Sequence, residues 1–72
     1  MGEEQFEKFG KSKTGNFEVV GSAKGQAGQN ALLIGCKVDM NEAKDELFEY
    51  LRNVKKQPGF KSFGGFIFRK QF

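Results

Sequence analysis

Residues 31–59 read ALLIGCKVDMNEAKDELFEYLRNVKKQPG, and they join the pattern of a strand directly to the pattern of a helix. The first part of this stretch, residues 31–39, alternates in the way of a strand that buries one face. One face carries Leu32, Ile34, Cys36 and Val38, and the other carries Leu33 and Lys37. This alternation predicts that the Cys36 thiol is buried and packs as a small hydrophobic group.

The second part of this stretch has the apolar spacing of an amphipathic helix. The apolar residues that share one helical face are Met40, Ala43, Leu47, Tyr50, Leu51 and Val54, and Phe48 lies beside them. We expect Asp39 or Asn41 to cap the N-terminus of this helix, with Glu42 three residues after Asp39 as in a capping box. We expect the segment QPG to end it, because Pro58 lacks the N–H that a helix requires.

Two further β-prone segments flank this unit. Residues 16–21 and 65–72 each read as a strand, and a Gly-rich polar loop, residues 22–30, connects the first to its neighbour. The predicted order is strand, strand, helix, strand. This order predicts an α+β fold in which one helix packs on one face of a three-stranded sheet. We assign residues 16–72 to this single ββαβ domain and expect residues 1–15 to form a partly ordered polar arm.

The composition argues against several classes of function. The chain has 72 residues, one cysteine and no histidine. It therefore forms no internal disulfide, and it lacks the cysteine and histidine pattern of zinc sites as well as the usual general base near neutral pH. We expect a non-enzymatic protein that uses no metal or cofactor. The absence of a secretory signal, a membrane-spanning run and paired cysteines predicts a soluble, intracellular protein of the cytoplasm or an organelle interior.

Charge is distributed unevenly along the chain. Residues 1–50 contain nine acidic and six basic residues, a net charge of −3, whereas residues 51–72 contain six basic residues and no acidic one, a net charge of +6. The sum is the formal charge of +3. A positive field concentrated at one end attracts phosphate groups or an acidic protein surface.

Two segments, LLIGCKVDMNEAKDELFEYL (residues 32–51) and KSFGGFIF (residues 61–68), resemble parts of the RNA-recognition motif family. The first resembles the opening strand and helix of that family. The second resembles its basic-aromatic strand, with matches at Lys61, Phe63, Gly64 and Phe68. The resemblance implies that RNA bases stack on Phe63 or Phe68. The sequence departs from the family because it offers no strand between the helix and this motif, and no second helix after it.

The Phe-rich end GFKSFGGFIFRKQF, residues 59–72, is the strongest functional signal. We expect Phe66, Phe68 and Phe72 to belong to the core, because so small a domain needs its largest apolar side chains there. The strand 65–72 is expected at the edge of the sheet or under a partner, because an apolar, β-prone edge is prone to pairing. Such an edge also offers a site for strand addition by another chain.

The remaining aromatic side chains, Phe48, Phe60 and Phe63, are expected to be exposed contacts beside basic residues. The predicted partner-binding residues are Phe48, Lys55, Lys56, Phe60, Lys61, Phe63, Arg69 and Lys70. Two functions remain open. The first is a small adaptor module or accessory subunit that docks on an acidic protein surface or a larger assembly. The second is a single-stranded nucleic-acid binder that stacks bases on aromatic rings and contacts phosphates with Lys and Arg.

Overall fold

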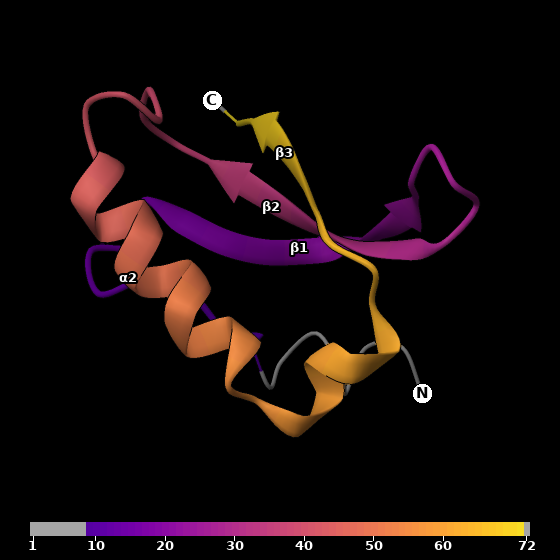
Figure 1. Ribbon diagram of the computed structural model, residues 1–72. Coiled ribbons are helices and arrows are strands. Elements are labelled where there is room, and N and C mark those ends of the chain that lie inside the picture. Colours follow the sequence, from indigo (N-terminus) through magenta and orange to yellow (C-terminus); the bar gives the residue numbers. More distant parts are fainter. Residues whose placement is uncertain (1–8, 72) are drawn as a thin grey trace.

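The computed structural model describes residues 9–71 (Figure 1). Along the chain the elements are β1 (Phe17–Lys24), β2 (Asn30–Cys36), α2 (Lys44–Lys55), the 3-10 helix η1 (Pro58–Ser62) and β3 (Phe66–Lys70). The α+β fold and the order strand, strand, helix, strand are therefore confirmed. The helix η1 was not predicted: Pro58 ends the helical stretch as expected and then begins a new turn of 3-10 helix.

The three strands form one mixed sheet in the order β1-β2-β3. The central strand β2 pairs antiparallel with β1 and parallel with β3. The prediction that the last strand lies at a sheet edge is confirmed. In the parallel register Leu32 lies opposite Phe66, and Ile34 lies opposite Phe68, so these four side chains share one face.

The β1–β2 hairpin closes through a short turn at residues 25–29. The Gly25 N–H donates to the Gln29 carbonyl at 2.7 Å, and the Gly28 N–H donates to the Gly25 carbonyl at 3.0 Å. Gly28 has a φ of 77°, which glycine adopts without the steric cost that other residues carry. The first strand is longer than we expected at its C-terminal end, because β1 continues to Lys24 beyond the predicted range of residues 16–21.

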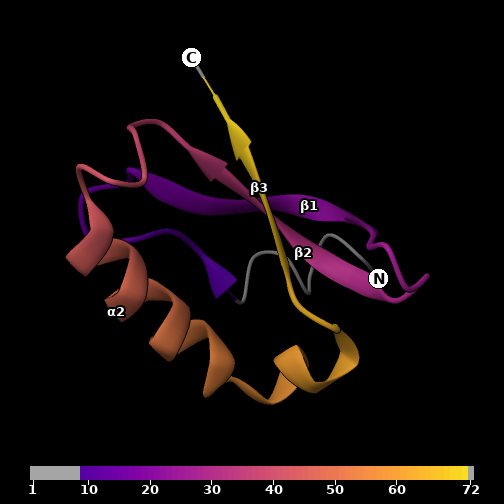
Figure 2. The same cartoon turned by 45° about the horizontal axis from the view of Figure 1, so that its top comes forward.

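The helix α2 covers one face of the sheet (Figure 2). Its buried residues are Leu47, Tyr50 and Val54, and they join a core that includes Phe17, Leu32, Ile34 and Cys36. The predicted burial of Cys36 is confirmed, with 4% of the residue exposed. Burial raises the pKa of this thiol, and a backbone hydrogen bond with Arg69 opposes that shift to a smaller extent.

The start of the helix differs from the prediction. The helix α2 begins at Lys44, after turns at residues 40–43, and its N-cap residue Ala43 supplies no side-chain hydrogen bond. The Asp39 carboxylate accepts the N–H of Asn41 at 3.0 Å, and the Asp39 carbonyl accepts the N–H of Glu42 at 3.0 Å. Asp39 therefore stabilises the turn before the helix instead of the helix itself. Met40 is 40% exposed and does not belong to the buried stripe.

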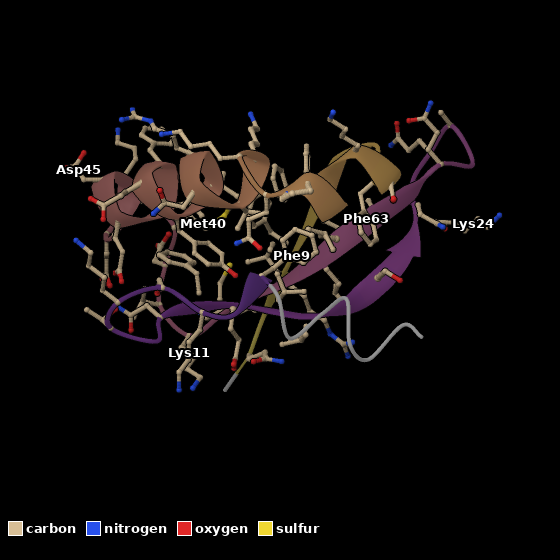
Figure 3. All side chains as sticks on the ribbon, turned by 90° about the horizontal axis from the view of Figure 1, so that it is seen from below. Phe9, Lys11, Lys24, Met40, Asp45 and Phe63 are labelled. Carbon is tan, nitrogen blue, oxygen red and sulfur yellow. The ribbon has the colours of Figure 1, made fainter. Side chains whose placement is uncertain are left out.

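A segment before β1 completes the core. Phe9 and Ser12 are buried, and Phe9 contacts Phe63 edge to face with ring centroids 5.9 Å apart (Figure 3). The same segment lies along the outer edge of β1, where Lys11 forms a β-bridge with Glu18. Residues 9–15 therefore add two buried side chains to the core. Within residues 9–71 no helix has the length and apolar character needed to cross a membrane.

Candidate partner-binding surface

Three phenylalanine rings form a row from η1 along β3. The rings of Phe60 and Phe66 are stacked with centroids 5.0 Å apart, and those of Phe66 and Phe68 are stacked at 6.3 Å. All three residues are half-buried and pack against the edge of the core. The Lys55 Nζ, at the end of α2, lies 5.9 Å from the centre of the Phe66 ring, within the range of a cation–π contact. We call Phe60, Phe66 and Phe68 the aromatic row.

The aromatic row corrects part of the sequence-based prediction. Phe60 was expected to be an exposed contact, but it is half-buried because it stacks on Phe66. Phe63 was also expected to be exposed, and it is half-buried because it contacts Phe9. Phe66 and Phe68 were predicted to belong to the core, but they are only half-buried and pack against its edge. Phe72, assigned to the same face, lies outside the described residues.

One side of α2 faces the aromatic row. Phe48, Leu51 and Lys55 recur at spacings of three and four, so they share this side of the helix. Phe48 is 56% exposed, as predicted. Lys44 and Arg52, each four residues from Phe48, flank it on the same side and are exposed. This side of the helix therefore carries apolar side chains bordered by positive charge.

Two acidic residues of α2, Glu46 and Glu49, face the segment before β1, whereas Asp45, three residues before Phe48, borders the side that carries Phe48. The Glu46 carboxylate accepts hydrogen bonds from the Thr14 hydroxyl and backbone N–H, and from the Asn16 Nδ2 at 3.2 Å. The Thr14 hydroxyl bond is the main cause that lowers the pKa of Glu46. The Glu49 carboxylate lies 3.0 Å from the Lys13 Nζ. These contacts hold the Glu46 and Glu49 carboxylates against the segment before β1, away from the side of α2 that carries Phe48.

The remaining predicted basic residues are spread over two faces. Lys56 follows α2 and Lys61 lies in η1, and both are exposed. The alternation of β3 places Lys70 on the face of α2 and Arg69 on the opposite face of the sheet. The structure thus brings together most of the predicted binding residues and separates Phe63 and Arg69 from them.

We define the basic aromatic surface by the residues that line this side of α2, η1 and β3. They are Phe48, Leu51, Lys55, Lys56, Phe60, Lys61, Phe66, Phe68 and Lys70. Leu51, Phe66 and Phe68 were not among the predicted partner-binding residues, because their apolar periodicity assigned them to the core. Among residues 9–71 no group of three or more histidine, cysteine, aspartate or glutamate residues is placed to hold a metal ion.

A hollow of about 270 Å³ lies at the C-terminal end of the aromatic row. Its apolar lining consists of Cys36, Val38, Met40 and Phe68, and its charged lining consists of Asp39, Arg69 and Lys70. The hollow lies outside the C-terminal ends of the parallel strands β2 and β3, where open sheets commonly receive ligands. Its mixed lining suits a large apolar side chain whose neighbours are negatively charged.

Comparison with models of known protein families, with curated proteins and with solved structures finds no match to this chain. The resemblance of two segments to the RNA-recognition motif is therefore not accompanied by a match to a family model.

Proposed function

We propose that this protein is a non-enzymatic binding module that docks on an acidic protein partner through its basic aromatic surface. The observation that carries the proposal is the position of the Lys55 ammonium over the Phe66 ring, at the junction of α2, η1 and β3. Aromatic side chains are enriched at the centres of protein interfaces, and charges at the rim of an interface steer the encounter with the partner. The basic aromatic surface supplies both, and Phe48 adds the most exposed ring.

Two observations favour a protein partner over single-stranded nucleic acid. A base needs an open ring face on which to stack. The rings of the aromatic row instead stack on one another at 5.0 and 6.3 Å, and all three are half-buried. A protein side chain that reaches the rim of the row needs no open ring face. We therefore keep nucleic acid as the outcome that would contradict the proposal.

The test is capture of partners from lysate of the source cells, with and without nuclease, using three forms of the protein. One form is the unchanged chain, and the second carries Lys55→Glu, Lys56→Glu and Lys61→Glu. The third carries Lys11→Glu, Lys24→Glu and Lys37→Glu, which changes the net charge equally. The control breaks one surface ion pair, Lys37–Glu18, and such a pair contributes little stability.

We expect an acidic protein to be enriched on the unchanged chain and on the control form, with or without nuclease. The form changed at Lys55, Lys56 and Lys61 loses it, mainly through a slower association rate, because charges at the rim of an interface steer the encounter. Loss of the captured partner after nuclease treatment would assign the surface to nucleic acid. Equal capture by all three forms would show that the basic residues serve solubility alone.

A further inference from the structure

We propose that an acidic, extended segment of the partner adds to the outer edge of β3 as a fourth strand of the sheet. This inference rests on the proposed function and specifies how the basic aromatic surface engages its partner. It assigns a role to a feature that the side chains alone do not explain, the exposed backbone of an edge strand. Strand addition uses main-chain hydrogen bonds for affinity and alternate side-chain positions for specificity.

The hydrogen bonds between β2 and β3 identify the free backbone groups. The Leu32 N–H donates to the Gly65 carbonyl at 3.0 Å, and the Gln71 N–H donates to the Cys36 carbonyl at 2.8 Å. Because a parallel ladder uses alternate residues, the groups of Gly65 and Gln71 point toward β2 and those of Phe66 and Phe68 point outward. No other strand of residues 9–71 lies beyond β3 to receive the outward groups.

The opposite edge of the sheet is treated differently. There the chain covers its own strand: the Ser12 N–H donates to the Phe17 carbonyl at 2.7 Å, and the Val19 N–H donates to the Gly10 carbonyl at 3.1 Å. Natural sheets usually blunt or cover their edges, because an open edge pairs with other chains. Among residues 9–71 the β1 edge is covered and the β3 edge is not, which is the asymmetry expected of a sheet that receives a strand on one side.

The side chains beside β3 define what the added strand must carry. On the face of α2, alternate residues of that strand would lie beside Phe66 and Phe68, which pack against the core together with Leu51. The hollow of about 270 Å³ next to Phe68 and Met40 has room for a large apolar side chain. The residues between the apolar positions point to the opposite face of the sheet, where Arg69 lies exposed, so they are best acidic. The occupant is therefore an extended segment that alternates apolar and acidic residues.

Charge also argues against a second copy of this chain as the occupant. Pairing of β3 with its own copy would place Arg69 and Lys70 of both chains on one small sheet, and it would bring together two sides of α2 that carry Lys44, Arg52 and Lys55. Like charges placed across a pairing of strands are destabilising. An acidic segment replaces this repulsion by attraction.

The experiment uses the full chain and a set of synthetic peptides, followed by amide hydrogen exchange in NMR. The lead probe is the capped heptapeptide Glu-Val-Glu-Phe-Glu-Val-Glu, and its controls replace every Glu by Gln or by Lys. Two further probes carry N-methyl groups, one on the amides of the Glu positions and one on the amides of the apolar positions. A methyl group removes the donor and blocks the edge, so only one of these two sets faces β3 in a paired strand.

We expect the acidic probe to bind at least about tenfold more tightly than the Gln and Lys controls, because it alone complements the bases. One N-methylated probe binds at least about tenfold more weakly than the other, because it loses hydrogen bonds to the edge. The amides of Phe66 and Phe68 exchange more slowly in the complex, whereas the amide of Ile67, already directed at β2, changes little.

Each other outcome overturns a distinct part of the argument. If the acidic probe binds preferentially but the two methylated probes are equal, strand addition is wrong and the proposed acidic docking stands. If the acidic probe binds no better than its controls, both are wrong. Slower exchange at Phe66 and Phe68 with a single-stranded oligonucleotide, but not with the peptide, assigns the edge to nucleic acid. Slow exchange there in a free protein that is dimeric assigns it to a second copy.

Discussion

At the scale of single residues, Tyr50 connects α2 to the segment before β1. Its hydroxyl donates to the Gly10 carbonyl at 2.7 Å, and the residue is 5% exposed. Burial is the main cause that raises its pKa to about 12, and the negative charge of Glu18 adds to the shift. The neutral phenol is thus the form that the folded protein retains.

The sign of the pH dependence follows from this shift. The ordinary pKa of tyrosine is 10.0, so above that pH the unfolded chain loses a proton that the folded chain keeps until about pH 12. Stability from this group is therefore complete below pH 10.0 and declines as the pH rises toward about 12. We expect Tyr50→Phe to lower the free energy of unfolding by about 1 kcal/mol at neutral pH, through loss of one hydrogen bond. The gap between the two proteins narrows at alkaline pH.

The measurement is denaturant unfolding at several pH values, with far-UV circular dichroism for both proteins. The chain has one Tyr and no Trp, so tyrosinate absorbance in the unchanged protein reports this residue directly. Ionisation of the lysines affects both proteins alike, and the difference between them isolates Tyr50. An unchanged gap from neutral to alkaline pH, or a native Tyr50 that ionises near pH 10.0, would contradict the argument.

At the scale of elements, the sequence predicted what local periodicity and strong stop signals determine. The alternation around Ile34 and the helical stripe around Leu47 each have one solution that buries the apolar side chains. The predicted start of α2 was wrong because the Asp39 side chain can either cap a helix or stabilise a turn, and tertiary packing selects the turn. The prediction that Phe60 is exposed was wrong. Phe60 stacks on Phe66, which is six residues away in the sequence, and η1, which brings the two rings together, was not predicted.

The attachment of the segment before β1 to α2 gives an element-scale prediction. Glu46→Ala removes the acceptor for Thr14 and Asn16, so we expect it to lower the melting temperature more than Glu42→Ala, a matched change of an exposed acid in the turn before α2. The folded pKa of Glu46 is lowered from 4.5, so its contribution is present above that pH and is lost as the pH falls through the lowered value. Melting curves at neutral and acidic pH test this, and equal melting temperatures for the two variants at neutral pH would refute it.

At the scale of the whole molecule, one side of α2 contributes to stability, and the other side belongs to the surface that we propose binds a partner. One side places Glu46 and Glu49 against the segment before β1, where Lys13 and Thr14 lie. The other side carries Phe48, Lys44 and Arg52, and its Lys55 lies over the Phe66 ring of β3. The sequence indicated this division only in part, as the change from net negative to net positive charge after Tyr50. The position of residues 9–15 determines which side of α2 lies near the β1 edge of the sheet. This position depends on contacts between distant segments, which the periodicity of the sequence does not reveal.

This division predicts opposite behaviour for two phenylalanine residues. Phe9 is 4% exposed and contacts Phe63, so Phe9→Ala removes part of a thin core and is expected to cost about 3–5 kcal/mol, a large share of the stability of a small domain. Phe48 is 56% exposed, so Phe48→Ala changes stability by about 0.5 kcal/mol or less and instead weakens binding at the basic aromatic surface. Denaturant unfolding by far-UV circular dichroism measures the first effect, and affinity for the acidic heptapeptide measures the second. If Phe9→Ala unfolds at the same denaturant concentration as Phe48→Ala, residues 9–15 are not part of the cooperative fold, and the covered edge of β1 no longer supports the assignment of β3 as the open one.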